Sequence, residues 1–431
     1  MCGSSYYKEG ANKLIPKFDE YKSRWEMRSD DSIKPGLASM YHALQLLDHP
    51  HKNLNVVHIA GTNGKGSTLA FLDSIARGHG LTVGKFMSPC IMDVHDQIQI
   101  NGTPILESEM DEVFRKMKYA GLSGLLTDFE LLTCAALLYF STKNVDLVLI
   151  EAGMGGREDS TNVVVPIVSI IPSIALEHTK FLGPTLESIA YHKAGIIKDG
   201  KPVVVGSLPE EALVVVEKET ILKNATLLQL NRDFRVENSN HSDIYINVIN
   251  NLVINDLKRS RLLGVHQGEN MALAITAFYL VAEKLAIAID DRKVSQGVYS
   301  ASLPGRFEQV LPNIYFDGAH NPASAKMLVK TIQQQFPNEK IRFVVGMLAD
   351  KDIATVLRIL ETMSDEFFFV DFENHRAMQA NQVINVSNAK SKQVIRDVVP
   401  FLKNASQNNE KCIVTGSLYL LSEIRQKMLV K

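Results

Sequence analysis

A glycine-rich turn with a single lysine separates a short apolar run from a helix-like run near the start of the chain. The turn has the sequence Ala60-Gly-Thr-Asn-Gly-Lys-Gly-Ser-Thr68. Residues 54–59 before it are mostly apolar and β-branched, which predicts a buried strand. Residues 68–77 after it carry apolar side chains at helical spacing, which predicts a helix. The segment therefore predicts a strand, a tight loop and a helix N-terminus, which is the basic unit of an open α/β sheet.

This kind of turn suits a phosphate group. Free N–H groups and the positive end of the helix dipole attract an anion, glycines let the backbone approach it, and Lys65 adds a positive charge. Ser67 or Thr68 is placed to reach a magnesium ion. The residues predicted to bind nucleotide phosphates are Gly61, Thr62, Asn63, Gly64, Lys65, Gly66, Ser67 and Thr68.

The spacing departs from the common phosphate-loop pattern. Only two residues separate Gly61 from Gly64, and Gly66 stands between the lysine and the serine. An ordinary glycine-rich strand-to-helix turn is therefore the alternative that this pattern leaves open.

The chain of 431 residues is longer than one hydrophobic core usually organises, so two domains are expected. Further apolar runs alternate with helical segments, which predicts a mostly parallel sheet with helices on both faces and ligands beyond the carboxyl ends of its strands. The predicted strands lie at 81–87, 145–150, 164–174 and 202–206, and then at 314–316, 341–345, 367–370 and 412–414. Polar residues at 231–260 predict hairpins, and 269–285 predicts a helix. We place the domains at 1–301 and 302–431.

Composition excludes some classes of protein. The chain is 45% hydrophobic and 22% charged with a net charge of −2, which does not favour a nucleic-acid surface or a polybasic membrane patch. No apolar run reaches membrane-spanning length, and the first residues lack a basic start followed by an apolar stretch. The scattered cysteines are typical of a reducing compartment, and they are Cys2, Cys90, Cys134 and Cys412. We therefore expect a cytoplasmic protein.

Two predicted strands run into polar clusters. Glu151 directly follows 145–150, and Glu177 and His178 follow 164–174. Because parallel strands end at one edge of a sheet, these side chains are expected near the phosphate turn, where a carboxylate can hold a hard cation. The alternatives are that Glu151 caps the next segment and that His178 is a structural histidine.

Further charged residues have no assignment from spacing alone. Arg157 and Asp159 form a pair after a glycine turn, and a surface ion pair is one interpretation of them. Lys193, near the end of a predicted helix, has the spacing of a surface lysine. Three residues of the second domain could hold a nucleotide or balance an acyl phosphate, or form an ion pair beside a turn: Arg306, Asp317 and His320.

Nine motifs between about Pro35 and Tyr419 resemble, in order, those of folylpolyglutamate synthases and dihydrofolate synthases of the Mur ligase superfamily. They are Gly61-Thr-Asn-Gly-Lys-Gly-Ser67, Glu151-x-Gly-x-Gly-Gly-Arg-x-Asp159, Glu177-His178 with Leu182-Gly183, Lys193-Ala-Gly-Ile-Ile-Lys198, His266-Gln-Gly-Glu-Asn270, Pro304-Gly-Arg-Phe307, Asp317-Gly-Ala-His-Asn-Pro322, Met347-Leu-Ala-Asp-Lys-Asp352 and Thr415-Gly-Ser-Leu-Tyr419.

The resemblance implies a fold and an activity. It implies a P-loop-containing central ATPase domain with a mostly parallel sheet, a smaller Rossmann-like C-terminal α/β domain, and an active site between them. It also implies a tetrahydrofolate synthase or dihydrofolate synthase type of ligase. ATP phosphorylates a carboxylate of the folate, and the amino group of L-glutamate attacks the acyl phosphate to form an amide. This chemistry leaves the protein mainly positioning and charge neutralisation to perform.

The resemblance further implies the ligands. These are ATP, two magnesium ions, a carbamylated lysine and a monovalent cation, with folate or dihydropteroate and L-glutamate as substrates. It implies a monomer without nucleic-acid or membrane partners.

The resemblance assigns residues by motif. Lys65, Lys193 and His320 are implied to be catalytic. Asn270 is expected at the adenine, and Arg306 and Asp317 complete the ATP site. The implied magnesium ligands are Ser88, Glu151, His178 and carbamylated Lys193. Phe129 and Glu130 resemble the segment that lines the folate pocket, although a buried helix start with a capping carboxylate is the alternative.

The chain departs from the family pattern at three places. Cys90 replaces a usual histidine after Ser-Pro, His95-Asp96-Gln97 stands where Asn-Glu-Arg is usual, and His192 replaces a common glutamate. The first two fall in the loop associated with the pterin substrate. They leave four possibilities open for the acceptor: a bifunctional enzyme, glutamate chain extension alone, the first addition to dihydropteroate alone, or a paralogue with another carboxylate substrate.

Three functions thus follow from the sequence. The leading prediction is an ATP-dependent folate:glutamate ligase. The alternatives are a Mur-type ligase that joins another acid and amine, and a non-catalytic nucleotide-binding module.

Overall fold

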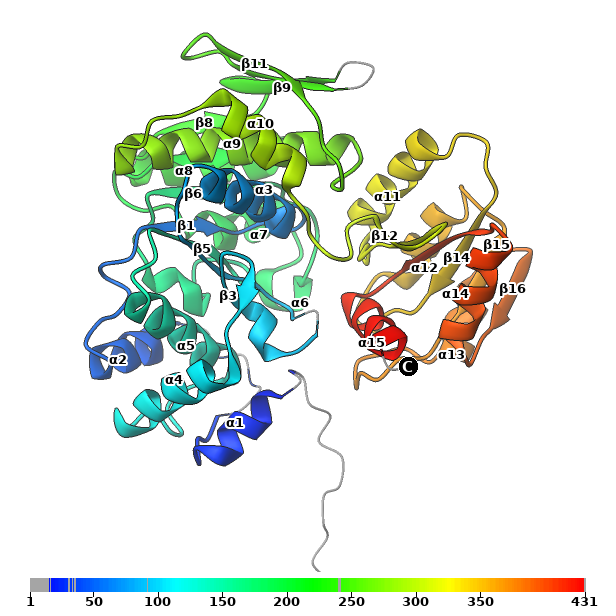
Figure 1. Cartoon of the computed structure of the whole chain (residues 1–431), viewed down its shortest axis with the longest axis horizontal. Coiled ribbons are helices and arrows are strands. Elements are labelled where there is room, and N and C mark those ends of the chain that lie inside the picture. The colour runs from blue at the N-terminus through cyan, green and yellow to red at the C-terminus, as the bar shows by residue number, and fades with distance from the viewer. Residues whose placement is uncertain are drawn as a thin grey trace, which may run out of the picture.

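The structure, a computed structural model, describes residues 15, 17–29, 32, 34, 36–90, 92–238 and 242–429. The N-terminal part of the described chain forms a larger unit with an eight-stranded and a three-stranded sheet, and the C-terminal part forms a smaller unit around a six-stranded sheet (Figure 1). Cys2 and Pro35 lie outside the described residues. The limits of the two domains, 1–301 and 302–431, stay a prediction.

The eight-stranded sheet is mostly parallel, and a short antiparallel pair extends one edge. Its strands, in spatial order, are β4 (Thr103–Pro104), β3 (Ile98–Ile100), β2 (Val83–Phe86), β5 (Leu147–Glu151), β1 (Val56–Ile59), β6 (Val168–Ile171), β7 (Val203–Val205) and β8 (Leu227–Gln229). Strands β5, β1 and β6 are neighbours, with Ile59 opposite both Glu151 and Ile170. The phosphate turn therefore leaves the sheet between the two strands that lead to the polar clusters.

Both faces of this sheet are covered because its strands are apolar on both sides. Val57 and Ile59 of β1 pack in one core with α3, α9 and α10, whereas Val56 packs in another with α1, α2, α4 and α5. The helices and 3₁₀ turns of this unit are α1 (Phe18–Arg24), α2 (Ala38–Leu46), α3 (Lys65–Gly78), η1 (Val94–Gln97), α4 (Glu107–Tyr119), α5 (Asp128–Thr142), η2 (Ser160–Val163), α6 (Thr179–Leu182), α7 (Leu186–Ala194), α8 (Glu210–Leu222), α9 (Val265–Leu285) and α10 (Asp291–Ser300).

The polar stretch at 231–260 forms the predicted hairpins. Three antiparallel strands, β9 (Phe234–Asn238), β10 (Asp243–Asn247) and β11 (Leu252–Leu257), pair in the order β11-β10-β9. This small sheet packs against α9 at the edge of the larger unit (Figure 1).

The smaller unit is also an α/β sandwich. Its strands, in spatial order, are β12 (Glu308–Leu311), β13 (Ile314–Phe316), β17 (Lys411–Thr415), β14 (Ile341–Val345), β15 (Glu366–Phe369) and β16 (Ser391–Val394). Only the β12–β13 pair is antiparallel. The helices are α11 (Pro322–Gln335), α12 (Ile353–Leu360), α13 (Ala380–Val386), α14 (Val398–Gln407) and α15 (Leu418–Leu429). Apolar side chains on both faces of the sheet pack in separate cores.

The predicted α/β class is confirmed, and one strand was predicted too long. The strand predicted at 164–174 covers only Val168–Ile171. Pro166 and Pro172 flank it, and proline cannot donate a backbone hydrogen bond to a neighbouring strand. Residues 164–167 form no regular element and follow η2, which lies in the loop after Glu151.

Among the described residues, no helix is both long enough and apolar enough to cross a membrane. The described cysteines Cys90, Cys134 and Cys412 are free and buried.

A close approach between α3 and α10 can be tested. A Cβ at Gly297 of α10 would lie 2.7 Å from the Cα of Ile75, which is backbone of α3. We expect Gly297→Ala to reduce the free energy of unfolding by about 1–3 kcal/mol, because one of the two helices must shift. Urea unfolding of the purified protein measures this change.

Gly268 of α9 is the matched control, because a Cβ there has no neighbour closer than 3.6 Å. Gly268→Ala should be neutral or stabilising by up to about 1 kcal/mol, the usual preference of a helix for alanine. Equal stability of wild type and Gly297→Ala would contradict the tight packing of α3 on α10.

Candidate active site

The phosphate turn forms the start of α3. This helix begins at Lys65, and its N-cap Gly64 has a φ of 87°, which favours glycine. A Cβ on Gly64 would lie 2.4 Å from the side-chain oxygen of Asn270. The turn therefore ends in a helix N-terminus with unpaired N–H groups, the arrangement that attracts an anion.

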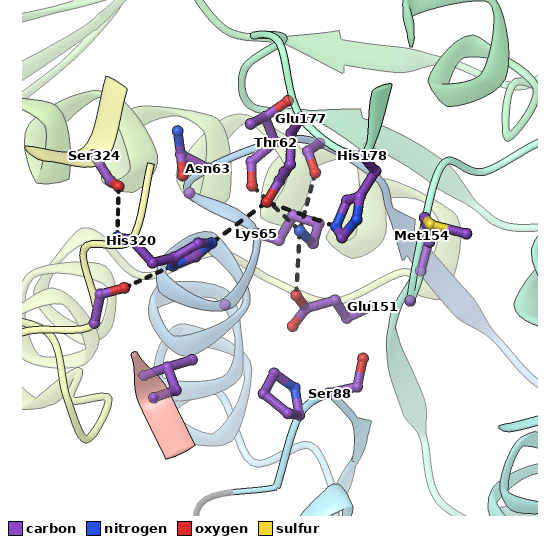
Figure 2. A pocket seen from close by; sticks show the side chains of 18 of the residues that line it. Thr62, Asn63, Lys65, Ser88, Glu151, Met154, Glu177, His178, His320 and Ser324 are labelled. Carbon is purple, nitrogen blue, oxygen red and sulfur yellow. Dashed lines mark hydrogen bonds and ion pairs between the residues drawn. The ribbon is translucent and has the colours of Figure 1, made fainter. Parts of the chain in front are cut away.

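Lys65 lies between this turn and β5. Its Nζ donates to the carbonyl of Gly61 at 2.9 Å and lies 3.6 Å from Oε1 of Glu151 (Figure 2). Glu151 is the last residue of β5 and is 6% exposed. Burial raises the pKa of its carboxyl, and the positive charge of Lys65 works against this rise. A metal ion bound beside the phosphates would therefore lie next to the carboxyl group of Glu151.

The end of β6 brings a carboxylate and two imidazoles together. Glu177 lies 3.7 Å from Nε2 of His178 and 3.4 Å from Nε2 of His320, which belongs to the smaller unit (Figure 2). Burial opposes ionisation of Glu177, but the hydrogen bond from His320 and the charge of Lys65 hold the pKa of this carboxyl well below its usual range. Burial lowers the pKa of His178 to about 4, so this imidazole is neutral near pH 7.

Lys193 is buried rather than exposed. It lies in the last turn of α7 and is only 2% exposed. Burial and the charge of Lys65 lower the pKa of its amine to about 7. Among the described residues, none forms a hydrogen bond or ion pair with the Lys193 amine. The interpretation as a surface lysine is therefore wrong.

Arg306 and Asp317 of the smaller unit lie on the same cavity but form no ion pair among the described residues. Asp317 accepts hydrogen bonds from the backbone N–H groups of Phe307 and Ala319, both at 2.9 Å. Burial raises the pKa of Asp317, and the charge of Arg306 works against this rise. The Arg306 guanidinium donates to the Gly305 carbonyl, so its remaining N–H groups can receive an anion.

Asn270 and Thr68 contact each other beside the turn. The side-chain oxygen of Asn270 lies 3.4 Å from the Thr68 hydroxyl, and its amide nitrogen donates to Gln267 at 3.0 Å. Asn270 lines the cavity, whereas Thr68 is fully buried and does not. The predicted contact of Asn270 with adenine stays a prediction.

Phe129 and Glu130 stand at the start of α5, as the alternative interpretation predicted. Glu130 is the third residue of a capping box, where one carboxylate oxygen accepts from the Thr127 N–H at 2.7 Å and the other from the Ser39 hydroxyl at 2.5 Å. Both residues line the cavity, but both carboxylate oxygens of Glu130 already accept hydrogen bonds. A direct contact between Glu130 and folate stays a prediction.

One cavity of about 600 Å³ collects nearly all of these groups. The predicted site residues that line it are Gly61, Thr62, Asn63, Gly64, Lys65, Gly66, Ser67, Ser88, Phe129, Glu130, Glu151, His178, Lys193, Asn270, Arg306, Asp317 and His320. Thr68 is the exception. Residues from both units form the wall, and the side-chain amide of Asn321 donates to the side-chain oxygen of Asn63 at 3.1 Å.

The side chains around the phosphate turn include the three non-lysine residues that were predicted to bind magnesium. Within the described residues, no three His, Cys, Asp or Glu side chains stand close enough to form a metal cage. Magnesium is usually bound by one or two carboxylates together with substrate phosphates and water. Ser88, Glu151 and His178 lie around the phosphate turn in Figure 2, so they fit a site completed by a nucleotide rather than an all-protein cage.

The sequence interpretation missed some residues and misjudged one pair. Lys351, which follows β14, has its amine 3.8 Å from Glu177. Its place after a strand end could have identified it.

Arg157 does not pair with Asp159 but with Glu219 at 2.7 Å. Glu151 caps no helix. Ile15, Ser32 and Lys34 also line the cavity, and no local pattern marks them.

The chain is similar to known proteins in sequence. A family model for the C-terminal domain of dihydrofolate synthetase matches residues 307–427. The dihydrofolate synthase/folylpolyglutamate synthase of Bacillus subtilis is 37% identical over 96% of this chain and 100% of that protein. The folylpolyglutamate synthase of Lacticaseibacillus casei is 32% identical over 90% and 92%.

Solved structures show the same likeness. The structure of E. coli FolC in complex with DHPP and ADP matches with a TM-score of 0.86 at 29% identity, covering 95% of this chain and 97% of that one. A complex of FPGS with AMPPCP matches with a TM-score of 0.81 at 29% identity, covering 96% and 99%. With these matches along nearly its whole length, the chain belongs to the folylpolyglutamate synthase and dihydrofolate synthase family.

Proposed function

We propose that this protein is an ATP-dependent amide ligase that adds L-glutamate to a folate through an acyl phosphate. The observation that carries this proposal is one cavity that is lined by Lys65 and the phosphate turn, by the aromatic ring of Phe129 and, from the smaller unit, by His320. A site for phosphates, a site for an aromatic acceptor and a group from a second unit are what a three-substrate ligase needs.

The phosphate turn and Lys65 hold ATP in this proposal. The N–H groups at the start of α3 bind the phosphate oxygens, and Lys65 neutralises charge as the terminal phosphoryl group moves to the acceptor carboxylate. Arg306 and Asp317 approach from the smaller unit. The amine of L-glutamate then forms the C–N bond, and phosphate leaves with the oxygen of the acceptor carboxylate.

Ser88, Glu151 and His178 are the proposed magnesium ligands. A bound magnesium ion would neutralise charge on the phosphates and orient them. Glu151 is suited to this role because it is buried and its only cationic neighbour, among the described contacts, is Lys65. Neutral His178 offers a ring nitrogen on the same side of the cavity.

Lys193 is proposed to become a carbamate that holds a second magnesium ion. A lysine amine must be uncharged to react with carbon dioxide, and the burial of Lys193 favours that form. A carbamate would convert an amine that has no partner among the described residues into an anion beside Lys65. A monovalent cation stays a prediction without an assigned residue.

His320 is proposed to act near the incoming amino acid. Its Nδ1 lies 2.8 Å from the Gly318 carbonyl, and its Nε2 faces Glu177. A ring held between these two partners lines the cavity in which the phosphoryl group and the glutamate carboxylate are proposed to meet.

A mass-resolved product assay tests the proposed function. Purified protein is incubated with ATP, magnesium and L-glutamate, and tetrahydrofolate and dihydropteroate are offered in separate tubes. Glutamylated product in both tubes assigns a bifunctional synthase, and product in one tube assigns the acceptor. ATP binding without product in either tube would contradict the proposal and favour a divergent ligase or a non-catalytic relative. The monomeric state and cytoplasmic location stay predictions.

Lys65→Ala should lower kcat by about 100-fold or more, since it removes a charge that stabilises the transferring phosphoryl group. Steady-state phosphate release in the presence of acceptor and glutamate measures this loss. Lys180→Ala is the control, because Lys180 is exposed on α6 and lies outside the cavity lining. An active Lys65→Ala enzyme would remove the basis for placing ATP phosphates at this turn.

Lys193→Ala should be nearly inactive, and bicarbonate or a short carboxylic acid should restore part of its activity. The added anion would occupy the space of the missing carbamate. The same additives should not restore Lys65→Ala, which lacks a cation rather than an anion. Full activity of Lys193→Ala without additives would show that the carbamate proposal is wrong.

A further inference from the structure

Gln97 carries an unpaired polar atom on the wall of the cavity. It is the last residue of η1, is 3% exposed and lines the cavity. Its side-chain oxygen is buried without a hydrogen-bond partner among the described residues. Four other described residues have such an atom, namely His51, His58, Asn162 and Arg425, and none of them lines this cavity.

Hydrogen bonds hold the backbone of the turn that contains Gln97. The Gln97 carbonyl accepts from the N–H of Met87 at 3.1 Å. At the start of the turn, the Asp93 carboxylate accepts from the N–H of His95 at 3.0 Å. The Asp96 carboxylate accepts from the N–H of Met92 at 2.6 Å.

The neighbouring charged and polar side chains are already paired. Asp93 contacts both the His95 ring at 2.6 Å and the Lys17 amine at 3.1 Å, and the hydroxyl of Tyr21 lies 2.7 Å from the other nitrogen of His95. None of these groups reaches the Gln97 amide. Since buried polar groups are nearly always hydrogen-bonded in folded proteins, the missing donor is expected from whatever fills the cavity.

The surroundings of Gln97 favour a flat ring. Ile98, the next residue, pairs with Phe86, whose ring stacks on Phe129 at 5.8 Å between centroids. Phe129 and the buried thiol of Cys90 line the same cavity. Burial raises the pKa of Cys90 to about 12, so this thiol is neutral as well. Phe129 and Cys90 thus give this cavity an aromatic ring and a neutral thiol in addition to the charged groups around Lys65.

We propose that the side-chain amide of Gln97 selects the acceptor by accepting a hydrogen bond from a ring N–H of its pteridine. The terminal torsion of a glutamine side chain is soft, so the amide can turn its oxygen to a donor in the cavity. Reduced pteridine rings carry N–H groups where the fully oxidised ring has bare nitrogen atoms. Gln97 therefore favours reduced acceptors. This inference rests on the proposed function.

Gln97→Met tests the proposal, because methionine has a similar length and no hydrogen-bonding oxygen. Its kcat/KM for tetrahydrofolate should fall about tenfold, the usual worth of one hydrogen bond, while that for fully oxidised folate changes little. The KM values for ATP and L-glutamate should stay the same. The free variant should be as stable as wild type or more stable in thermal unfolding, because an unpaired buried polar atom is removed.

Gln99 provides the matched control. It lies on β3 outside the cavity lining, and its amide donates to the Asp96 carbonyl at 2.8 Å. Gln99→Met tests whether loosening of this turn alone changes acceptor preference. We expect no change in the ratio of kcat/KM for tetrahydrofolate to kcat/KM for fully oxidised folate. Equal loss of preference in both variants would overturn the assignment to Gln97.

Two further results for Gln97→Met would overturn its proposed role in acceptor selection. An unchanged acceptor preference in Gln97→Met, or a variant that is less stable and weaker toward all substrates, would show that Gln97 pairs with water or serves the fold. Failure of the proposed function is distinguishable, because wild type would then make no glutamylated product from either acceptor. That result would overturn both proposals.

Discussion

The buried contact between Lys65 and Glu151 organises the candidate site. It joins the first residue of α3 to the last residue of β5, across the edge where β5, β1 and β6 end side by side. A lone carboxylate in this position would be costly to bury, and a lone lysine would repel the charge of Lys193 without compensation. The pair places a cation and an anion side by side at the phosphate turn, where a phosphate and a metal ion are proposed to bind.

The two units of the protein meet around this pair. Glu177 faces His320 and Lys351, and Asn63 of the phosphate turn contacts Asn321 at the start of α11. Groups that are distant in sequence therefore share one cavity only while the units are in contact. The chemistry proposed here depends on this closeness, because neither unit alone presents both the phosphate turn and His320.

Local sequence patterns predicted most of what sits at strand ends. The glycine turn, Glu151, Glu177 and His178 could be placed together because parallel strands end at a common edge. Other features depend on tertiary contacts. The burial of Lys193 results from packing of α7, and the partner of Arg157 is 62 residues away. No local pattern reports that both oxygens of Glu130 are occupied or that the oxygen of Gln97 has no partner. The strand at 168–171 is shorter than predicted because prolines flank it on both sides, and proline cannot donate a backbone hydrogen bond to a neighbouring strand.

The proposed reaction requires that one cavity place the acceptor carboxylate next to the terminal phosphate of ATP. Isotope transfer shows whether that carboxylate is phosphorylated. A folate acceptor labelled with ¹⁸O in its reacting carboxylate is converted to product, and the released phosphate is analysed by mass spectrometry. The phosphate should carry one ¹⁸O atom from the acceptor, since phosphorylation and amide formation move that oxygen. Unlabelled phosphate, or label in a nucleoside monophosphate, would contradict the proposed reaction.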